Sequence, residues 1–372
     1  MRFITFNLLF LQLASLSSQT AMTSPTKVQI VFVEALAPKD TTSSERFQKE
    51  YETAVALGKV QVEEELARCG YQLSTKMVFY DASDSIQALE QAKKLSQEDM
   101  WLLIGPRRSN HYLLFAQGAL ETPSVSLMAS SREVSELGSL HVSLAPTNKK
   151  MAQVAVDKVK DFSLSSEAGF LSVVAEDCVT CVDFEKDFAE IAKKEGIKKL
   201  GIIKLNGESP SLEEVKNKVK SLKPAFVLVP NYSKLSAAII HAAQPLSPKS
   251  VFIGGDGWGD TNFGFVQNNV YVGQAKGFTV RGFPPHQVGL TQFSLGKNLS
   301  KGNASRVASS SSLAILKTFD GLKDLLCSKK PETRQSFASS FKRESTKIFN
   351  SPWGVSVFSL QDGNIVYSET RR

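Results

Sequence analysis

Two apolar runs decide the fold of this chain, Trp101-Leu102-Leu103-Ile104 and Ala225-Phe226-Val227-Leu228-Val229. Neither run alternates apolar with polar residues, and such runs are typical of strands buried on both faces of a parallel sheet. The first run stops at Gly105-Pro106 and the second stops at Pro230-Asn231. Each strand is therefore followed by a polar loop at its carboxyl end, which is where open α/β sheets bind ligands.

Similar runs flank these two in two successive passes along the chain. The first pass has strand-like runs at residues 28–33, 77–80, 101–104 and 124–128, and the second at 170–175, 200–204, 225–229 and 251–253. Helical patterns separate them, such as the segment Glu45 to Arg68, whose apolar residues recur at near-helical spacing. Alternating strands and helices predict parallel sheets covered by helices. We therefore expect an α/β protein with two doubly wound parallel-sheet lobes.

The last hundred residues interrupt this alternation. A long helix is predicted from about residue 309 to 327, and residues 355–358 and 365–367 read as a hairpin because Asp362-Gly363 supplies the turn. We assign the hairpin to the second lobe. The predicted division is residues 26–145 plus 274–345 for lobe 1 and residues 146–273 plus 346–372 for lobe 2.

The amino terminus has the pattern of a secretory signal. Arg2 is followed by the mostly apolar run from Phe3 to Leu16 and then by small and polar residues up to Ala21. The run is shorter than the roughly 20 apolar residues of a spanning helix. We expect residues 1–21 to be a cleaved signal peptide and the mature protein to be periplasmic, with its net charge reduced from +7 to +6 by the loss of Arg2.

Composition narrows the function further. The basic residues are spread along the chain, so no nucleic-acid partner is expected. Four cysteines are too few for a disulfide scaffold at this length. Cys178-Val179-Thr180-Cys181 can be a local loop disulfide or a redox motif, and we favour the structural disulfide. A single CxxC makes a poor zinc site, and no metal or cofactor is expected.

Two serines follow strands of the first lobe and can serve one ligand. Ser109 follows Ile104-Gly105-Pro106 and opens a helix whose free backbone amides suit an anion, although a helix cap is an equal alternative. Ser130 forms a capping-box pattern with Glu133, so a cap is its default role. Because both serines follow strands of the same sheet, we expect them to converge on one crevice.

An acid on the second lobe completes the candidate site. Asp256 lies in Gly254-Gly255-Asp256-Gly257-Trp258, where glycines let the backbone approach a ligand closely. A carboxylate there can accept hydrogen bonds from an ammonium group, and a tight turn closed by Asp256 itself is the alternative. Serines on one lobe and an acid on the other would hold the two charges of an α-amino acid.

At these residues the sequence resembles the type I periplasmic solute-binding proteins, including the branched-chain amino acid binders, over nearly the whole mature chain. The family's Ile-Gly-Pro segment with a following hydroxyl is matched by Ile104-Gly105-Pro106 and Ser109, and its Ala-Ser/Thr step by Ala129-Ser130. Its second-lobe acid is matched by Asp256, and its cleft aromatic by Tyr232. The resemblance implies two lobes joined by a multi-strand hinge.

Two departures from the family pattern bear on the ligand. Arg107-Arg108 stands where small residues are common, and Cys178-Val179-Thr180-Cys181 replaces the usual Tyr-Gly. The resemblance still implies an exported protein that captures a small polar ligand, an amino acid by the charges above, and delivers it to a membrane permease or receptor of ABC type.

The sequence also bears on two other classes of function. An enzyme is not expected, because no Gly-x-Ser-x-Gly elbow, His-Glu-x-x-His, P-loop or Rossmann glycine fingerprint is present. An envelope interaction or regulatory protein with a vestigial cleft remains the alternative, because a fold does not fix a function. An open crevice around Ser109, Ser130 and Asp256 would favour solute capture, and a filled crevice would favour the interaction protein.

Overall fold

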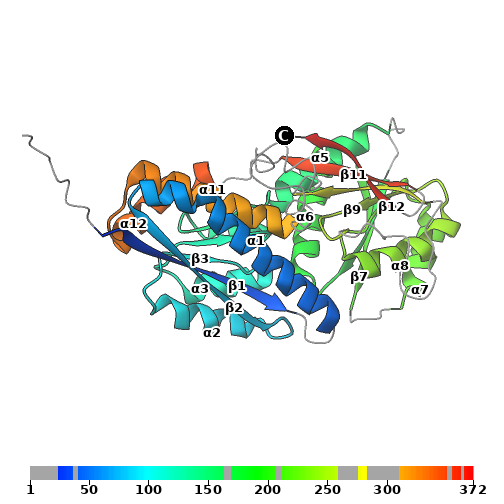
Figure 1. Ribbon diagram of the computed structural model, residues 1–372. Coiled ribbons are helices and arrows are strands. Elements are labelled where there is room, and N and C mark those ends of the chain that lie inside the picture. Colours follow the sequence, from blue (N-terminus) through cyan, green and yellow to red (C-terminus); the bar gives the residue numbers. More distant parts are fainter. Residues whose placement is uncertain are drawn as a thin grey trace, which may run out of the picture.

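The computed structural model describes residues 24–36, 41–162, 169–206, 211–258, 275–282, 310–349, 354–361 and 364–371. The predicted signal segment, residues 1–21, and the Asp362-Gly363 turn lie outside these ranges. No helix among the described residues is long and apolar enough to span a membrane. Two α/β lobes lie side by side (Figure 1).

The first lobe is built on a five-stranded parallel sheet in the order β2-β1-β3-β4-β5. Its strands are β1 (Thr26–Leu36), β2 (Tyr71–Asp81), β3 (Leu102–Ile104), β4 (Ser124–Ser126) and β5 (His141–Ser143). Its helices are α1 (Thr41–Arg68), α2 (Ile86–Ser96), α3 (Ser109–Gly118), α4 (Arg132–Glu136), α11 (Ser310–Lys329) and α12 (Arg334–Ile348). β1 buries side chains on both faces, and all three residues of β3 are buried, as its unbroken apolar run predicts.

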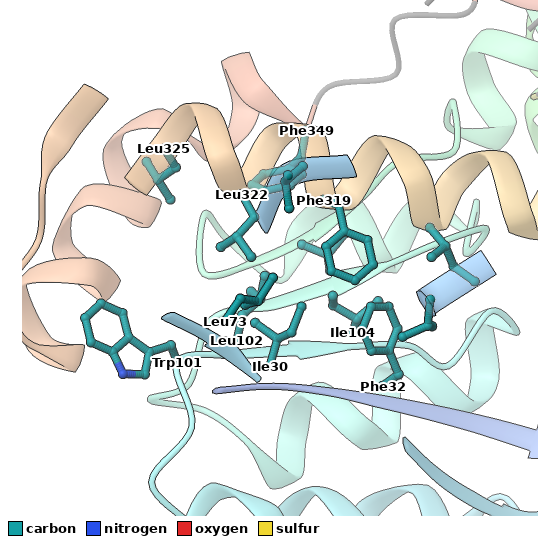
Figure 2. Packing of buried hydrophobic residues seen from close by; sticks show 14 of the residues in the cluster. Ile30, Phe32, Leu73, Trp101, Leu102, Ile104, Phe319, Leu322, Leu325 and Phe349 are labelled. Atoms are coloured by element: carbon teal, nitrogen blue, oxygen red, sulfur yellow. The ribbon is translucent and has the colours of Figure 1, made fainter. Parts of the chain in front are cut away.

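The two faces of this sheet are covered by different parts of the chain. One face packs Ile30 and Phe32 against α1, α11 and α12, so a C-terminal segment completes the core of an N-terminal sheet (Figure 2). The other face packs Val31 and Val33 against α2 and α3. A disulfide joins Cys69, at the end of α1, to Cys327 in α11. The cysteine count did not reveal this bridge.

The second lobe has a seven-stranded sheet in the order β12-β11-β10-β9-β8-β6-β7. Its strands are β6 (Gly169–Ala175), β7 (Lys198–Leu205), β8 (Phe226–Leu228), β9 (Val251–Gly254), β10 (Lys276–Arg281), β11 (Val355–Gln361) and β12 (Asn364–Arg371). Its helices are α5 (Asn148–Lys160), α6 (Val179–Lys194), α7 (Glu213–Leu222) and α8 (Ser233–Ala243), followed by the short 3-10 helix Gln244–Leu246. β6 to β10 are parallel, whereas β11 and β12 run antiparallel to their neighbours.

Residues 274–345 were predicted to belong to the first lobe, and this prediction is wrong for β10. Lys276–Arg281 pairs with β9 and β11 in the second sheet, and the irregular sequence after Phe278 concealed this strand. The predicted switch back at residue 346 is too early, because Phe349 is fully buried in the core of the first lobe. The hairpin of β11 and β12 extends the second sheet, as its residues predicted.

Candidate functional site

The loop after β3 gives its two arginines different roles. Arg107 is held in place, because its Nε lies 3.7 Å from the buried Glu34 carboxylate and its guanidinium stacks 4.0 Å above the Phe47 ring. Burial raises the pKa of Glu34, while the positive charge of Arg107 opposes that shift. Arg108 is exposed and lines a cavity at the boundary between the lobes. Of the two arginines, only Arg108 is therefore placed to meet a ligand.

Ser109 lies at the centre of a small group of converging donors. Its Oγ accepts hydrogen bonds from the backbone amides of Ser130 at 3.1 Å and Ser131 at 3.2 Å. Thr180, in the first turn of α6 on the second lobe, donates to the same oxygen at 3.3 Å. The residue that caps α3 is Arg108, so the alternative role of Ser109 as a helix cap does not hold.

Ser130 lies beside Ser109 but does not form the expected capping box. The residue that caps α4 is Ser131, and its side chain makes no capping hydrogen bond. Ser130 is 3% exposed and takes part through its backbone amide. The neighbouring Ala129 is 1% exposed and its amide donates to Ser126 Oγ at 3.0 Å. The segment after β4 therefore presents backbone groups to Ser109.

Asp256 lies away from this group, beside the hinge. Its carboxylate accepts from the Gly282 amide at 3.3 Å, and Gly282 in turn packs closely on Pro146, where the chain passes from β5 to α5. Burial raises the pKa of Asp256 although Arg281 is nearby. The carboxylate therefore links the end of β10 to the turn after β9. This differs from the alternative, in which Asp256 closes its own turn. Asp256 does not line the cavity that Arg108 borders.

The interlobe cavity is about 240 Å³ in volume and draws residues from both lobes. Arg108 and Asn110 come from the first lobe, and Asp177, Thr180 and Tyr232 from the second. Tyr232 is 58% exposed, in keeping with its predicted place at the cleft. Arg108 and Asp177 supply one positive and one negative charge. Sequence reasoning did not select Asn110 or Asp177, although Asn110 directly follows Ser109 and Asp177 directly precedes the Cys178-Val179-Thr180-Cys181 motif.

Beyond the Ser109 group, a polar interface joins the lobes. Arg132 of α4 pairs with Asp187, which is almost fully buried, and lies 3.6 Å from Glu190. The backbone amide of Asn148, the first residue of α5, donates to the Ser130 carbonyl of the first lobe at 2.8 Å. Ser131 Oγ and Asn148 Oδ1 are buried without a hydrogen-bond partner among the described residues. The interface is therefore polar and incompletely satisfied, unlike a hydrophobic core.

A second and larger cavity, of about 610 Å³, lies on the far side of the Ser130 segment. Ala129 and Ser130 line it, together with the β5 strand, the hinge residues Ala145 to Thr147, and the end of α12. The five residues predicted for one site are thus distributed. Ser109 is buried between the lobes, Ala129 and Ser130 border this cavity, Tyr232 borders the interlobe cavity, and Asp256 borders the hinge.

Neither family models nor curated proteins match this sequence. Solved structures do match it in three dimensions. A leucine-binding protein from Thermotoga maritima is 11% identical with a TM-score of 0.71, over 92% of this chain and 98% of that one. A branched-chain amino acid transporter substrate-binding protein from Streptococcus pneumoniae, solved with isoleucine, is 14% identical with a TM-score of 0.65, over 92% and 99%.

A third match shows a different ligand. A solute-binding protein of an ABC transporter from R. palustris, solved with 4-hydroxybenzoate, is 12% identical with a TM-score of 0.68, over 93% of this chain and 96% of that one. At these identities the likeness shows a shared fold. The ligands of the matched structures include both amino acids and aromatic acids, so the fold alone does not select between them.

Proposed function

We propose that this chain, which has the type I periplasmic binding protein fold, is an exported solute-binding protein that captures a small polar ligand between its lobes. The observation that carries the proposal is the convergence of donors from both lobes on one oxygen position, next to a cavity of about 240 Å³. In the structure Ser109 Oγ occupies that position. If the Ser109 side chain turns away, a ligand carboxylate can accept from the same two amides, which suit an anion.

The charges around the cavity favour a zwitterionic ligand. Arg108 can receive a carboxylate and Asp177 an ammonium group, through charge-assisted hydrogen bonds. An amino acid therefore remains the proposed ligand, with Ser109, Ala129, Ser130, Tyr232 and Asp256 as the proposed site and Arg108 and Asp177 added to it. Asp256 would act at the hinge, where it can respond to closure.

Hinge motion follows from the character of the interface. Opening the lobes would expose the unpartnered Ser131 Oγ and Asn148 Oδ1 to water, which lowers the cost of breaking the interlobe contacts. A ligand that touches both lobes binds the closed form better and shifts the population toward it. We propose that the closed form then docks a membrane permease or receptor of ABC type.

Export is supported by the two disulfides, because such bonds persist in oxidising compartments and are rare in the cytosol. The signal-like residues 1–21 agree with this proposal.

Thermal unfolding of the chain lacking residues 1–21 tests the proposal, with amino acids, amides, sugars and aromatic acids as candidate ligands. A ligand present at 100 times its dissociation constant adds about 2.7 kcal/mol to the unfolding free energy. We expect a shift with one class, reduced in Asp177→Asn and Ser109→Ala but retained in Ser359→Ala, which changes a serine of the distant β11–β12 hairpin. A shift with no compound would contradict solute capture.

One observation favours a second candidate, an envelope interaction protein on the same fold. The crevice expected to be open around Ser109 is filled by Ser109 itself and by the facing Thr180. If no compound stabilises the protein and scattering shows the same compact shape in every condition, the interaction protein becomes the better explanation.

A further inference from the structure

The Cys178-Val179-Thr180-Cys181 motif forms a covalent ring at the boundary between the lobes. Cys178 and Cys181 are joined by a disulfide. Cys178 is also the residue that caps α6, because its Sγ accepts from the Cys181 amide at 3.3 Å. α6 begins at Val179, inside this motif, so the disulfide spans a helix amino terminus.

The ring holds the residue that contacts the first lobe. Thr180 lies between the two cysteines, and its hydroxyl donates to Ser109 Oγ at 3.3 Å. Its carbonyl accepts from Asn148 Nδ2 at 3.1 Å. Ser109 Oγ in turn accepts the amides of Ser130 and Ser131. The disulfide therefore fixes the backbone of a residue on which the chain of contacts across the interface depends.

The two cysteines differ in their position relative to the interlobe cavity. Cys178 is 9% exposed and lines the cavity together with Arg108 and Asp177, whereas Cys181 is 3% exposed and is not part of the lining. A thiolate that enters the cavity would therefore attack Cys178 Sγ and release Cys181 as the thiolate. The Cys181 amide, which donates to Cys178 Sγ, and the Arg108 cation, which lines the same cavity, stabilise the Cys178 thiolate that the second thiol of the reductant later displaces.

We propose that Cys178–Cys181 is a reducible disulfide served by a small dithiol or the dithiol of a reductase, and that its reduction loosens the contact between the lobes. The first thiolate forms a mixed disulfide with Cys178 as the bond between Cys178 and Cys181 breaks. The second thiol of the reductant then displaces Cys178 and leaves as an intramolecular disulfide. Two electrons and two protons pass from the dithiol to the protein.

Reduction of the ring should weaken the contact between Thr180 and Ser109 whether or not a solute binds. With the ring open, Val179 and Thr180 regain conformational freedom, so the Thr180 hydroxyl spends less time on Ser109. The interface between the lobes then opens more often and lets water reach the Ser130 and Ser131 amides. The other disulfide, Cys69–Cys327, lies within the first lobe and provides a matched control.

Hydrogen exchange at the Ser130 and Ser131 amides, with trapping of free thiols by alkylation, tests the proposal in the protein lacking residues 1–21. In the Cys69→Ser/Cys327→Ser protein, only the ring can respond to dithiothreitol. We expect the peptide containing residues 178–181 to become alkylated under native conditions and both amides to exchange about threefold to tenfold faster, as the loss of one neutral hydrogen bond predicts.

A second variant tests the effect of an open ring in the absence of the reductant. Cys178→Ala/Cys181→Ala, with Cys69–Cys327 intact, should show the faster exchange without dithiothreitol and no further change when it is added. Thr180→Val, which keeps the ring, should show the same faster exchange. Comparing these variants with the wild type still tests the proposal if the Cys69→Ser/Cys327→Ser protein does not fold.

Two results would overturn the inference. The ring could stay oxidised in excess dithiothreitol while the protein remains folded, which would show that the sulfur is not reachable. Alternatively, the ring could open by reduction or by substitution while exchange at Ser130 and Ser131 stays unchanged, which would show that it does not support the contact between the lobes.

Discussion

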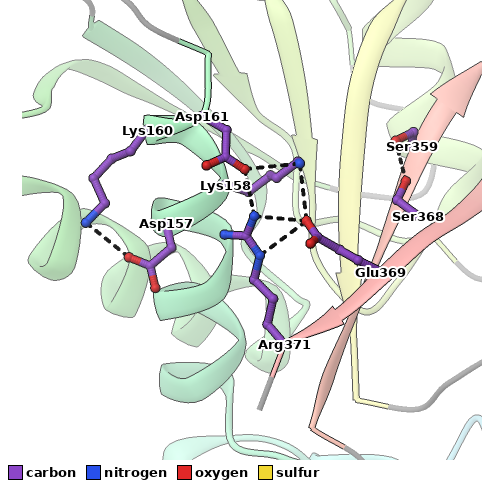
Figure 3. Close-up of polar contacts among 8 residues, drawn as sticks. All are labelled: Asp157, Lys158, Lys160, Asp161, Ser359, Ser368, Glu369 and Arg371. Atoms are coloured by element: carbon purple, nitrogen blue, oxygen red, sulfur yellow. Dashed lines mark hydrogen bonds and ion pairs between the residues drawn. The ribbon is translucent and has the colours of Figure 1, made fainter.

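The C-terminal part of the chain is attached to the two lobes in different ways. On the first lobe, α11 lies over the sheet with Phe319, Leu322 and Leu325 fully buried, and a disulfide ties it to α1 (Figure 2). On the second lobe, β12 is an edge strand whose end is held by partly exposed charges of Lys158, Asp161, Glu369 and Arg371 (Figure 3).

This difference predicts which interactions stabilise each attachment. Burial of large apolar side chains stabilises by several kcal/mol, whereas exposed ion pairs contribute about 0–1 kcal/mol. We therefore expect the first lobe to depend strongly on its returning helices. The ion pairs on the second lobe should matter little, because the hairpin is already held by backbone pairing and by the buried Val355 and Val357.

Truncation of Phe319 should have the largest effect. Its ring is fully buried with its centroid 5.6 Å from that of Phe32, so Phe319→Ala should lower the unfolding free energy by about 4 kcal/mol. Urea denaturation measures the change. The matched control is Val366→Ala on β12, which removes a 41% exposed side chain and should change the unfolding free energy by about 0.5 kcal/mol or less.

A second substitution tests whether the same contact sets the packing of α1 on α11. A Cβ at Gly58 would lie 2.2 Å from Phe319 Cδ2. Gly58→Ala should therefore destabilise the wild type but cost far less in the Phe319→Ala background, where the ring is gone. Equal costs in the two backgrounds would show that the two helices do not depend on this contact.

Loss of the Cys69–Cys327 bridge should rank next. The bridge closes a loop across 258 positions of sequence, whereas Cys178–Cys181 spans 3. Because the stabilisation from loop closure grows with loop length, Cys69→Ser/Cys327→Ser should lower the unfolding free energy by about 3 kcal/mol, and Cys178→Ser/Cys181→Ser by less. Thermal unfolding of both proteins would refute this account if the order of the two effects were reversed.

The buried strands and the Cys69–Cys327 bridge differ in how well the sequence predicts them. The buried strands can be predicted from local sequence. An unbroken apolar run such as Trp101 to Ile104 must be covered on both faces, whichever elements cover it. The Cys69–Cys327 pairing depends on α11 returning over α1, and no local pattern records that return. β10 was missed for a similar reason, because its assignment rests on pairing with β9 and β11.

The candidate site shows the same limit. Both serines follow strands of one sheet and lie close together, since the Ser130 amide donates to Ser109 Oγ, while their convergence on one ligand stays a prediction. The sequence could not predict that Ser109 Oγ would accept from the Ser130 and Ser131 amides, since that depends on how the segments after β3 and β4 pack in the folded lobe. Nor could it distinguish Arg107 from Arg108, because the buried Glu34 that fixes Arg107 lies more than seventy residues away in the sequence.

Acid should act on the two lobes in different pH ranges. His111 is buried in the first lobe, where its Nδ1 lies 2.7 Å from the Tyr80 hydroxyl, and burial followed by the Arg108 charge lowers its pKa to about 4. The unfolded chain takes up this proton near pH 6.5 and the folded chain only near pH 4. Stability is therefore full above pH 6.5 and falls as the pH drops toward 4.

A comparison of variants isolates this effect. Between pH 7 and pH 4.5 the wild type should lose about 2 kcal/mol more than His111→Asn, measured by urea denaturation at each pH. On the second lobe, hydrogen bonds from Arg371 lower the pKa of Asp161 and Glu369, so their contribution persists to lower pH and is lost only as the pH falls through those lowered values.

The smallest effect should come from the charges at the end of β12. Arg371 lies 2.6 Å from Asp161 and 2.9 Å from Glu369, but all three side chains are 27–47% exposed. Arg371→Ala should lower the unfolding free energy by about 0.5 kcal/mol at low salt and by less in 1 M sodium chloride, because salt screens exposed pairs.

A matched pair supplies the control, since Lys160 bridges Asp157 and Glu195 on the same lobe without touching the hairpin. Lys160→Ala should have a similarly small and salt-sensitive effect. A double-mutant cycle of Arg371→Ala with Asp161→Ala then measures their coupling. If that coupling exceeded about 2 kcal/mol, the hairpin would depend on its charges as much as α11 depends on its buried side chains, and the contrast between the lobes would fail.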